Sequence, residues 1–289
     1  MITVPGTPGP INQERGRAPS VEQSAETAHP GRRQIPLKGS PMLDAMLAKL
    51  EALQPLPEED KKLLHAIVGK GRPIKAGDPI TLEGEQYKLV HVMLSGHACR
   101  YKILADGKRQ IIGYLVPGDF CDLFGFLLDR MDHSISALTP CEIVELTEDD
   151  VLMLTARPML ARALWWSNLV DSAILREWLV NVGRRTPDKR IAHILCELLV
   201  RLQTVGVARS NGFRLALSQA DLGDTVGLTT VSVNRALQRL RRSRLIVQTS
   251  REITIPDVSA LMAFADFDPS YLHFRQDRDE PLQPRQEIA

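Results

Sequence analysis

The segment from residue 218 to 246 concentrates hydrogen-bonding and cationic side chains at helical spacing. Its second half, from Thr230 to Arg242, is TVSVNRALQRLRR. At about 100° per residue, one stripe of such a helix is apolar. It consists of Val233, Ala236, Leu237 and Leu240. The opposite face presents amides and guanidinium groups, which can make paired hydrogen bonds with adenine or guanine edges. We therefore expect base contacts from Thr230, Val231, Asn234 and Arg235, with Val231 meeting a thymine methyl.

The residues before this helix predict a helix-turn-helix. Ser218 followed by Asp221 forms a capping signature, Gly227 allows a tight turn, and Thr229 caps the second helix. The hydrophobic and polar positions thus place one face of the second helix outward. A second, weaker set of side chains around it is expected to contact phosphates. This set contains Ser218, Gln219, Thr229, Ser232, Gln238, Arg239, Arg241 and Arg242.

Local charge supports a polyanionic partner. The whole chain carries a net charge of only +1, but residues 184–251 hold thirteen Arg and Lys against four Asp and Glu, a net of +9. A localised basic segment of this kind is typical of phosphate binding, and double-stranded DNA is the expected partner. Arg184, Arg185 and Arg190 have two open interpretations, phosphate contact or solvation of a hinge at Gly183.

Upstream elements must position this helix. Residues 1–41 contain seven Pro, five Gly and no aromatic residue, which predicts a disordered leader. Short β-branched runs broken by glycine turns between 72 and 146 predict a roll or barrel of strands. Residues 42–146, including two N-terminal helices, form the expected sensor domain. A winged helix-turn-helix over 183–263 and a loose tail over 264–289 complete the expected organisation, so the fold class is α+β.

Between these domains, Thr147 and Asp150 cap a predicted long helix, residues 147–182. One apolar stripe contains Leu160, Leu164, Ile174 and Trp178, and a second contains Ala163, Trp166, Val170, Ala173 and Val180. Two stripes suggest two partners, the chain's own roll and a second copy of the chain, so we expect a homodimer. A buried helix in the core of a monomer is the alternative.

Composition excludes several classes of protein. The 289 residues are 44% apolar and 25% charged, and no run approaches the roughly 18–20 apolar residues of a membrane span. The N-terminus lacks the apolar region of a secretory signal. Cys99, Cys121, Cys141 and Cys196 are widely spaced, which favours reduced thiols in a cytoplasm. We find no nucleophile–base pattern, phosphate loop or metal-ligand spacing, so an enzyme is not expected.

The order of these parts resembles the cyclic-AMP receptor/fumarate-nitrate regulator (Crp/Fnr) family. The resemblance covers roughly residues 55–265 and lies in these residues: Ala76-Gly77-Asp78, Glu83-Gly84, Leu94-Ser95-Gly96, Pro117-Gly118-Asp119-Phe120 and the stretch 219–246. It implies a cyclic-nucleotide-binding-like jelly roll, a long dimerisation helix and a winged helix-turn-helix. It further implies a homodimer that binds two-fold symmetric DNA and recruits or blocks RNA polymerase. A glutamate is common in the family where Val231 stands, so a different base preference is expected there.

The resemblance also identifies candidates for an effector pocket, which departs from the family pattern. Where cyclic-nucleotide binders carry Gly-Glu-Leu and later an arginine that holds the phosphate, this chain has Cys121-Asp122-Leu123 and then His133-Ser134. A largely neutral imidazole cannot replace a guanidinium clamp, so cyclic AMP is not expected. No cysteine precedes Cys99, so the family's iron–sulfur cluster is not expected either. Asp122, Leu123, His133 and Ser134 remain the pocket candidates.

Other sensing chemistry has weaker support in the sequence. His91, His97 and His133 could ligate haem, but lone histidines on strands are typically structural, so no haem is expected. Cys196 precedes the helix-turn-helix and is a redox candidate. The leading hypothesis is a DNA-binding transcription regulator. The alternative is a ligand-binding module whose basic helical domain binds protein instead of DNA. The sequence does not specify the effector, the target promoters, activation or repression, or the role of the N-terminus.

Overall fold

The structure, a computed structural model, describes residues 41–69, 71–86, 89–123, 125–208, 211–215, 217–249 and 252–275. The expected disordered leader, residues 1–41, lies outside these residues except for Pro41, which begins the first helix. The expected C-terminal tail, residues 264–289, is described only as far as residue 275. No helix in the described part of the chain is long and apolar enough to cross a membrane.

The N-terminal half is a roll of two antiparallel sheets preceded by two helices, α1 (Pro41–Leu53) and α2 (Glu58–Ile67). One sheet has the order β1 (Arg72–Ile74), β7 (Cys141–Leu146), β3 (Val90–Ser95). The other has the order β2 (Pro79–Thr81), β6 (Ser134–Ala137), β4 (Ala98–Ile103), β5 (Arg109–Leu115). A short 3-10 turn, η1 (Gly125–Leu127), precedes β6. The glycine-punctuated strands therefore form the predicted roll.

Two of the turn glycines allow another segment of the backbone to approach closely. Gly96 has φ +81°, and a Cβ there would lie 2.4 Å from the carbonyl oxygen of Pro140. Gly118 has φ +89°, and its Cβ would lie 2.6 Å from the carbonyl oxygen of Ala45 in α1. Only glycine adopts this backbone and permits this approach without strain. The Pro117-Gly118-Asp119 turn is thus packed directly on the first helix.

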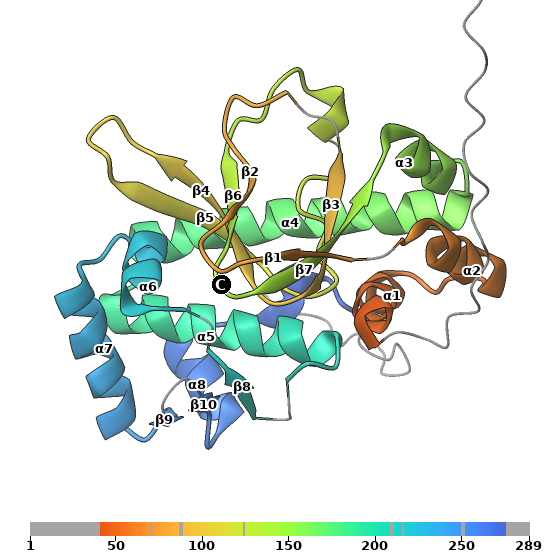
Figure 1. The fold of residues 1–289 in the computed structure, drawn as a ribbon. Coiled ribbons are helices and arrows are strands. Elements are labelled where there is room, and N and C mark those ends of the chain that lie inside the picture. The colour runs from red at the N-terminus through yellow and green to blue at the C-terminus, as the bar shows by residue number, and fades with distance from the viewer. Residues whose placement is uncertain are drawn as a thin grey trace, which may run out of the picture. The chain divides into compact units, whose positions relative to one another are not determined.

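The expected single helix over 147–182 is two helices, α3 (Glu148–Thr155) and α4 (Pro158–Arg184). The Thr147–Asp150 capping box is confirmed, and Pro158 occupies the first turn of α4, where its missing N–H costs nothing. A proline at that position cannot continue α3, which explains the break. Gly183 does not interrupt the helix, because α4 ends only at Arg184, with Arg185 as its C-cap. Figure 1 shows α4 running alongside the strands of the roll.

The buried and exposed apolar residues of α4 do not divide along the two predicted stripes. Its buried residues come from both predicted stripes: Leu160, Ala163, Leu164, Val170, Ala173, Ile174 and Trp178. Because the roll, α1 and the C-terminal domain all pack against α4, its buried face is wider than one stripe. Of the second predicted stripe, only Val180 is exposed, and Trp166 is half-buried. Apolar residues that do face outward are Trp165, Leu169, Leu175 and Leu179, together with Val180.

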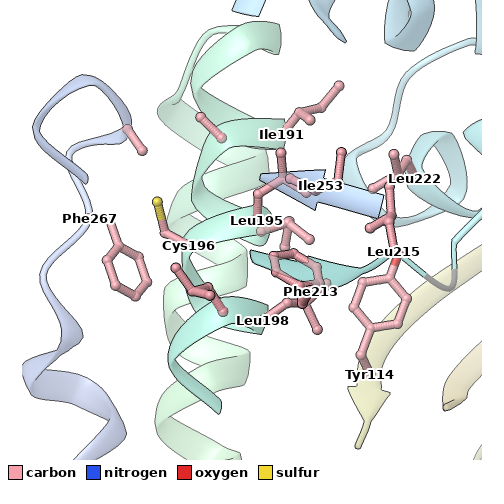
Figure 2. Packing of buried hydrophobic residues seen from close by; sticks show 14 of the residues in the cluster. Tyr114, Ile191, Leu195, Cys196, Leu198, Phe213, Leu215, Leu222, Ile253 and Phe267 are labelled. Carbon is pink, nitrogen blue, oxygen red and sulfur yellow. The ribbon is translucent and has the colours of Figure 1, made fainter. Parts of the chain in front are cut away.

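The C-terminal half contains four helices and a small sheet. In chain order they are α5 (Pro187–Thr204), β8 (Gly212–Arg214), α6 (Gln219–Val226), α7 (Thr230–Arg242), β9 (Val247–Thr249), β10 (Glu252–Thr254) and α8 (Val258–Ala265). The two strands predicted after α7 are present, and β8 adds a third in the order β8-β10-β9. Figure 2 shows Leu195 and Leu198 of α5 packing against Phe213 and Ile253 of this sheet.

The segment after α8 is not a loose tail in its described part. Phe267 and Leu272, the latter in a 3-10 turn η2 (Pro269–Leu272), are buried in the same core as α5. The Tyr271 hydroxyl donates to Glu197 Oε2 at 2.8 Å. The predicted start of the tail, residue 264, lies too early, because the polar residues that suggest a tail dominate the sequence only after Phe274. Residues 264–275 complete the C-terminal core.

Candidate nucleic-acid interface and sensor cavity

The helix pair α6 and α7 has the local geometry that its sequence predicts. Ser218 Oγ accepts from the Asp221 backbone N–H at 3.1 Å, and Asp221 Oδ2 accepts from the Ser218 N–H at 3.0 Å. Gly227 ends α6 with φ 66° and ψ 41°, in the left-handed region. Thr229 Oγ1 then accepts from the Ser232 N–H at 3.2 Å and caps α7. These contacts fix the angle between the two helices.

The division of α7 into an inner and an outer face is confirmed. Val233, Ala236, Leu237 and Leu240 are buried, and each is at most 1% exposed. The outer face contains Thr230, Val231, Arg235, Gln238, Arg241 and Arg242, which are exposed, and Asn234, which is half-buried. Val231 is 58% exposed although it is apolar. Packing within the chain therefore does not explain why an apolar residue occupies position 231.

A shallow groove of about 470 Å³ lies on the outer face. Its lining consists of Gln219 from α6 and Thr230, Val231, Asn234, Arg235 and Gln238 from α7. Within it, Gln238 Nε2 donates to Asn234 Oδ1 at 2.9 Å, and Asn234 Nδ2 donates to Gln219 Oε1 at 3.3 Å. This chain of amides orients the Asn234 side chain. The structure thus brings the four predicted base-contacting residues together in one groove.

The predicted phosphate contacts fall into two groups. Arg241 and Arg242 are exposed beside the groove, and Arg241 donates to Gln248 Oε1 at 3.3 Å. Arg239 instead lies against α5, where its Nε donates to Asp188 Oδ2 at 2.6 Å. Ser218, Thr229 and Ser232 are at the helix caps described above. Arg239 is therefore held in an ion pair within the protein.

Of the three arginines near Gly183, Arg184 differs from Arg185 and Arg190 in its contacts. Arg184 is exposed at the end of α4. Arg185 donates to Glu177 Oε1 at 2.6 Å and to the Asp266 carbonyl at 3.1 Å. Arg190 donates to the carbonyls of Arg185 and Val226, at 2.8 and 2.9 Å. The contacts of Arg185 and Arg190 join α4, α5 and α6 to one another.

A cavity of about 510 Å³ lies between the roll and α4. Its walls are formed by β5, by the segment from Cys121 to His133 and by the middle of α4, with Arg100 and Arg201 at its edge. Asp122, Leu123 and His133 line it, as the resemblance implied. Ser134 is outside the lining: its hydroxyl accepts from the Glu83 N–H at 2.9 Å. The alternation of side chains along β6 turns Ser134 away from its neighbour.

Polar groups around the cavity are bonded mainly to other parts of the chain. His133 Nδ1 is 2.6 Å from Asp132 Oδ1, which lowers the pKa of Asp132. Arg100 donates from Nε to the Cys121 carbonyl at 2.9 Å and from Nη2 to Asp171 Oδ2 of α4 at 3.0 Å. Asp122 lies under β3, where its Oδ1 accepts from the His91 N–H at 3.2 Å. The guanidinium of Arg100 is therefore already neutralised.

A buried ionic network connects the sensor half to α5. Asp119 accepts from Lys49 Nζ at 2.7 Å and from Arg201 Nη2 at 2.6 Å, and all three residues are buried. Burial alone would raise the pKa of Asp119, but the charges of Lys49 and Arg201 outweigh it, and the pKa lies below its ordinary value. No local spacing in the sequence predicts this network. A cation at 201 on the apolar face of α5 was the signal available.

The histidines and cysteines considered for sensing make contacts within the chain or are buried. His91 Nδ1 is 3.4 Å from Asp122 Oδ2, and burial lowers the pKa of His97 to about 4. No group of three potential metal ligands occurs among the residues the structure describes. All four cysteines are buried, and burial raises the pKa of Cys196 to about 12. A reactive thiol needs a lowered pKa and exposure, so the structure does not support the redox hypothesis for Cys196.

Comparisons with known proteins match both halves of the chain. The Crp-like helix-turn-helix domain family matches residues 189–264, and the cyclic nucleotide-binding domain family matches residues 71–157. The chain is 30% identical over 228 residues to the transcriptional activator protein Anr of Pseudomonas protegens, which covers 77% of this chain and 91% of that protein.

Two further matches are to FixK proteins. The nitrogen fixation regulation protein FixK of Azorhizobium caulinodans is 33% identical over 176 residues, covering 60% of this chain and 69% of that protein. The solved structure of FixK2 from Bradyrhizobium japonicum aligns with a TM-score of 0.60 at 25% identity, over 68% of this chain and 96% of that one. The similarity thus extends across both domains and the helix between them.

Proposed function

The chain belongs to the Crp/Fnr family of DNA-binding transcription regulators, and we propose that it acts as a homodimer in the cytoplasm that reads two-fold symmetric promoter sites with α7. The observation that carries this proposal is the groove on α7. Its apolar residues are buried on one face, while a polar, cationic face with one exposed valine is open to a partner. That arrangement fits the major groove of DNA.

Base recognition is assigned to Thr230, Val231, Asn234 and Arg235. Arg235 supplies a guanidinium for guanine, Asn234 an oriented amide for adenine, and Val231 an apolar contact for a thymine methyl. Arg241, Arg242 and the capped start of α6 lie beside this groove and supply phosphate contacts. Gln219 and Gln238 have a different primary role, because both hydrogen-bond to Asn234 and fix its amide.

The dimer is assigned to the outward stripe of α4, which contains Trp165, Leu169, Leu175 and Leu179. Each of these side chains is more than half exposed, so the single chain leaves a continuous apolar strip in water. Pairing with a second α4 would cover it and would give the two α7 helices a fixed separation. Successive major grooves on one side of DNA are about 34 Å apart, and the dimer must match that spacing.

The sensor cavity is proposed to bind something other than a cyclic nucleotide. A cyclic phosphate needs an unpaired cation, and the two arginines that line the cavity are both bonded within the chain, Arg100 to Asp171 and Arg201 to Asp119. His133 stands where the family places the phosphate-binding arginine. The dispersed and buried cysteines likewise give no support to an iron–sulfur cluster. RNA polymerase is the proposed partner at the promoter.

The test is selection of DNA from a random pool with the purified full-length chain. Enrichment of a two-fold symmetric motif is the expected result, and its affinity should fall steeply with salt because phosphate contacts release counterions. Cyclic AMP added to the binding reaction should leave the motif and the affinity unchanged. If no sequence is enriched and DNA binding is weak at every salt concentration, the regulator proposal fails and a protein-binding role for the basic domain takes its place.

A further inference from the structure

Strand β5 of the roll has two different neighbours. Ile112, Gly113 and Tyr114 line the sensor cavity. Residues of the same strand also touch α6, the first helix of the helix-turn-helix. One strand therefore forms a wall of the sensor cavity and a support of the DNA-binding unit. The contacts on the α6 side are of two kinds, ionic and buried polar.

The ionic contact is made by Arg109 at the start of β5. Its Nε donates to Asp224 Oδ2 at 2.8 Å, and its Nη2 donates to Asp221 Oδ1 at 2.5 Å. The three side chains are between 15% and 33% exposed, so solvent screens the pairs only in part. Asp221 also caps α6. A cation from the sensor domain thus bridges two successive turns of the helix that supports α7.

The buried contact is made by Tyr114 at the end of β5. Its hydroxyl hydrogen-bonds with the Thr225 hydroxyl and donates to the Asp221 carbonyl at 3.4 Å. Tyr114 and Thr225 are both almost wholly buried. Gln110 Nε2, from the same strand, donates to the Thr225 carbonyl at 3.2 Å. Figure 2 shows Tyr114 in the same cluster of side chains as Leu215 and Leu222 of the DNA-binding unit.

Arg109 differs from the other cations that pair with acidic residues of the basic segment, because it lies outside that segment. That segment, residues 184–251, has four acidic residues. Asp188 is paired with Arg239 and Glu197 with Arg201, both from within the segment. Asp221 and Asp224 are instead paired with Arg109, which belongs to the sensor domain. The sensor therefore supplies the counterion for two carboxylates of the helix-turn-helix.

We propose that these contacts form an interdomain latch, defined as Arg109, Tyr114, Asp221, Asp224 and Thr225, which sets the orientation of α7 relative to the sensor domain. In the latched arrangement the base-contacting face is uncovered, since Thr230, Val231 and Arg235 are exposed. The latch thus presents α7 to DNA, and breaking it frees the helix-turn-helix to take other orientations. The DNA readout of this inference rests on the proposed function, but the latch itself does not.

The decisive variants break the ionic half of the latch from either side. We would compare R109Q, D224N and the exchanged pair R109D/D224R in the full-length chain, and leave Asp221 intact because it caps α6. Both single variants are expected to weaken DNA binding by about twofold to fivefold, the range of a partly screened ion pair. The exchanged pair is expected to recover most of the loss.

A pure charge effect predicts a different pattern. Removing the positive charge of Arg109 would weaken DNA binding, whereas removing the negative charge of Asp224 would strengthen it. Effects of opposite sign in R109Q and D224N would therefore overturn the latch. So would unchanged affinity in both variants, or an exchanged pair that binds more weakly than either single variant.

Amide hydrogen exchange of the free protein supplies a readout that needs no DNA. In R109Q and D224N, residues 109–115 and 219–226 should exchange faster than in the wild type, while β3 and β7 serve as internal controls. The exchanged pair should restore protection. If the wild type selects no DNA sequence, the proposed function fails and this measurement still tests the latch. If exchange in α6 is unchanged in both variants, the latch is overturned whatever the DNA result.

Discussion

Arg201 of α5 donates to Asp119 of the sensor turn at 2.6 Å, and both side chains are almost wholly removed from solvent. The two residues belong to different domains, and Lys49 of α1 completes the site. Three segments that are distant in the sequence are therefore joined through the Asp119 carboxylate. A buried ion pair adds little net stability over apolar packing, but removal of one partner leaves a charge that cannot be solvated.

Asp119→Asn tests this dependence. The variant keeps the shape of the side chain and removes its charge, so Lys49 loses its buried counterion. We expect the free energy of unfolding to fall by about 3 kcal/mol, measured by urea denaturation. The exposed Asp129→Asn, which lies in the loop before β6, is the matched control and should change stability by less than about 0.5 kcal/mol. Equal effects in the two variants would contradict the role given to the network.

Two histidines, the half-buried His97 and the buried His193, predict an acid-sensitive fold. Burial lowers the pKa of His97 to about 4, and burial and the nearby Arg185 lower that of His193 to about 3. An unfolded histidine binds its proton near pH 6.5, so below that pH the unfolded state holds more protons than the folded one. Stability should fall as pH drops from about 6.5 toward 4, by up to about 1.4 kcal/mol per pH unit for each imidazole. His97→Gln should flatten the measured slope, and an unchanged slope would refute the assignment.

Arg235→Ala tests base recognition. The arginine is exposed in the α7 groove and makes no contribution to the buried stripe, so the fold should be unaffected. Specific DNA binding should weaken by about 1–3 kcal/mol, and selection from a random pool should show relaxed preference at one base pair in each half-site. Lys75→Ala, which removes an exposed cation of the sensor domain, is the control. A uniform loss on all sequences would instead make Arg235 a phosphate contact.

Leu179→Glu and Trp165→Glu test the dimer. These side chains are 75% and 63% exposed in the single chain, so a charge at either position should not disturb the core of one subunit. In a paired α4 the charge would be buried without a partner. Analytical ultracentrifugation should show a dimer for the wild type and a monomer for the variants. Leu152→Glu, on the exposed face of α3, should leave the mass unchanged. Dimeric variants would move the interface elsewhere.

Thiol labelling tests the exclusion of redox sensing. Cys99, Cys121, Cys141 and Cys196 are buried, and burial raises the pKa of each thiol. A thiol-reactive disulfide should therefore modify none of them quickly in the native protein and all four after denaturation. Rapid labelling of Cys196 under native conditions would restore it as a redox candidate.

Local sequence patterns predicted the DNA-binding unit well, because its determinants lie within a few residues of each other. The Ser218–Asp221 box, the left-handed Gly227 and the buried stripe of α7 are all local. The division of the roll into strands follows from its glycine turns for the same reason. The helix over 147–182 was predicted as one element because a single proline at 158 can be a kink or a boundary, and only the packing of α4 decides between them.

Long-range relationships were not predictable from one sequence. The pairing of Arg109 with Asp224 and of Arg201 with Asp119 depends on how the two domains pack, and no spacing rule connects residues so far apart. The outward stripe of α4 was not predicted, for a related reason. Which of two apolar stripes on a helix faces outward cannot be decided until the elements that pack against the helix are known. Here both stripes face the interior for most of their length.

The burial of Phe267 and Leu272 beside α5 has a consequence for biosynthesis. A chain emerges from the ribosome N-terminus first, so the roll, α4 and α5 are all made before η2. Until then Glu197 lacks the Tyr271 hydroxyl, and the apolar face of α5 lacks part of its cover. The sensor domain can therefore mature during translation, whereas the DNA-binding unit reaches its final packing only after η2 has been made.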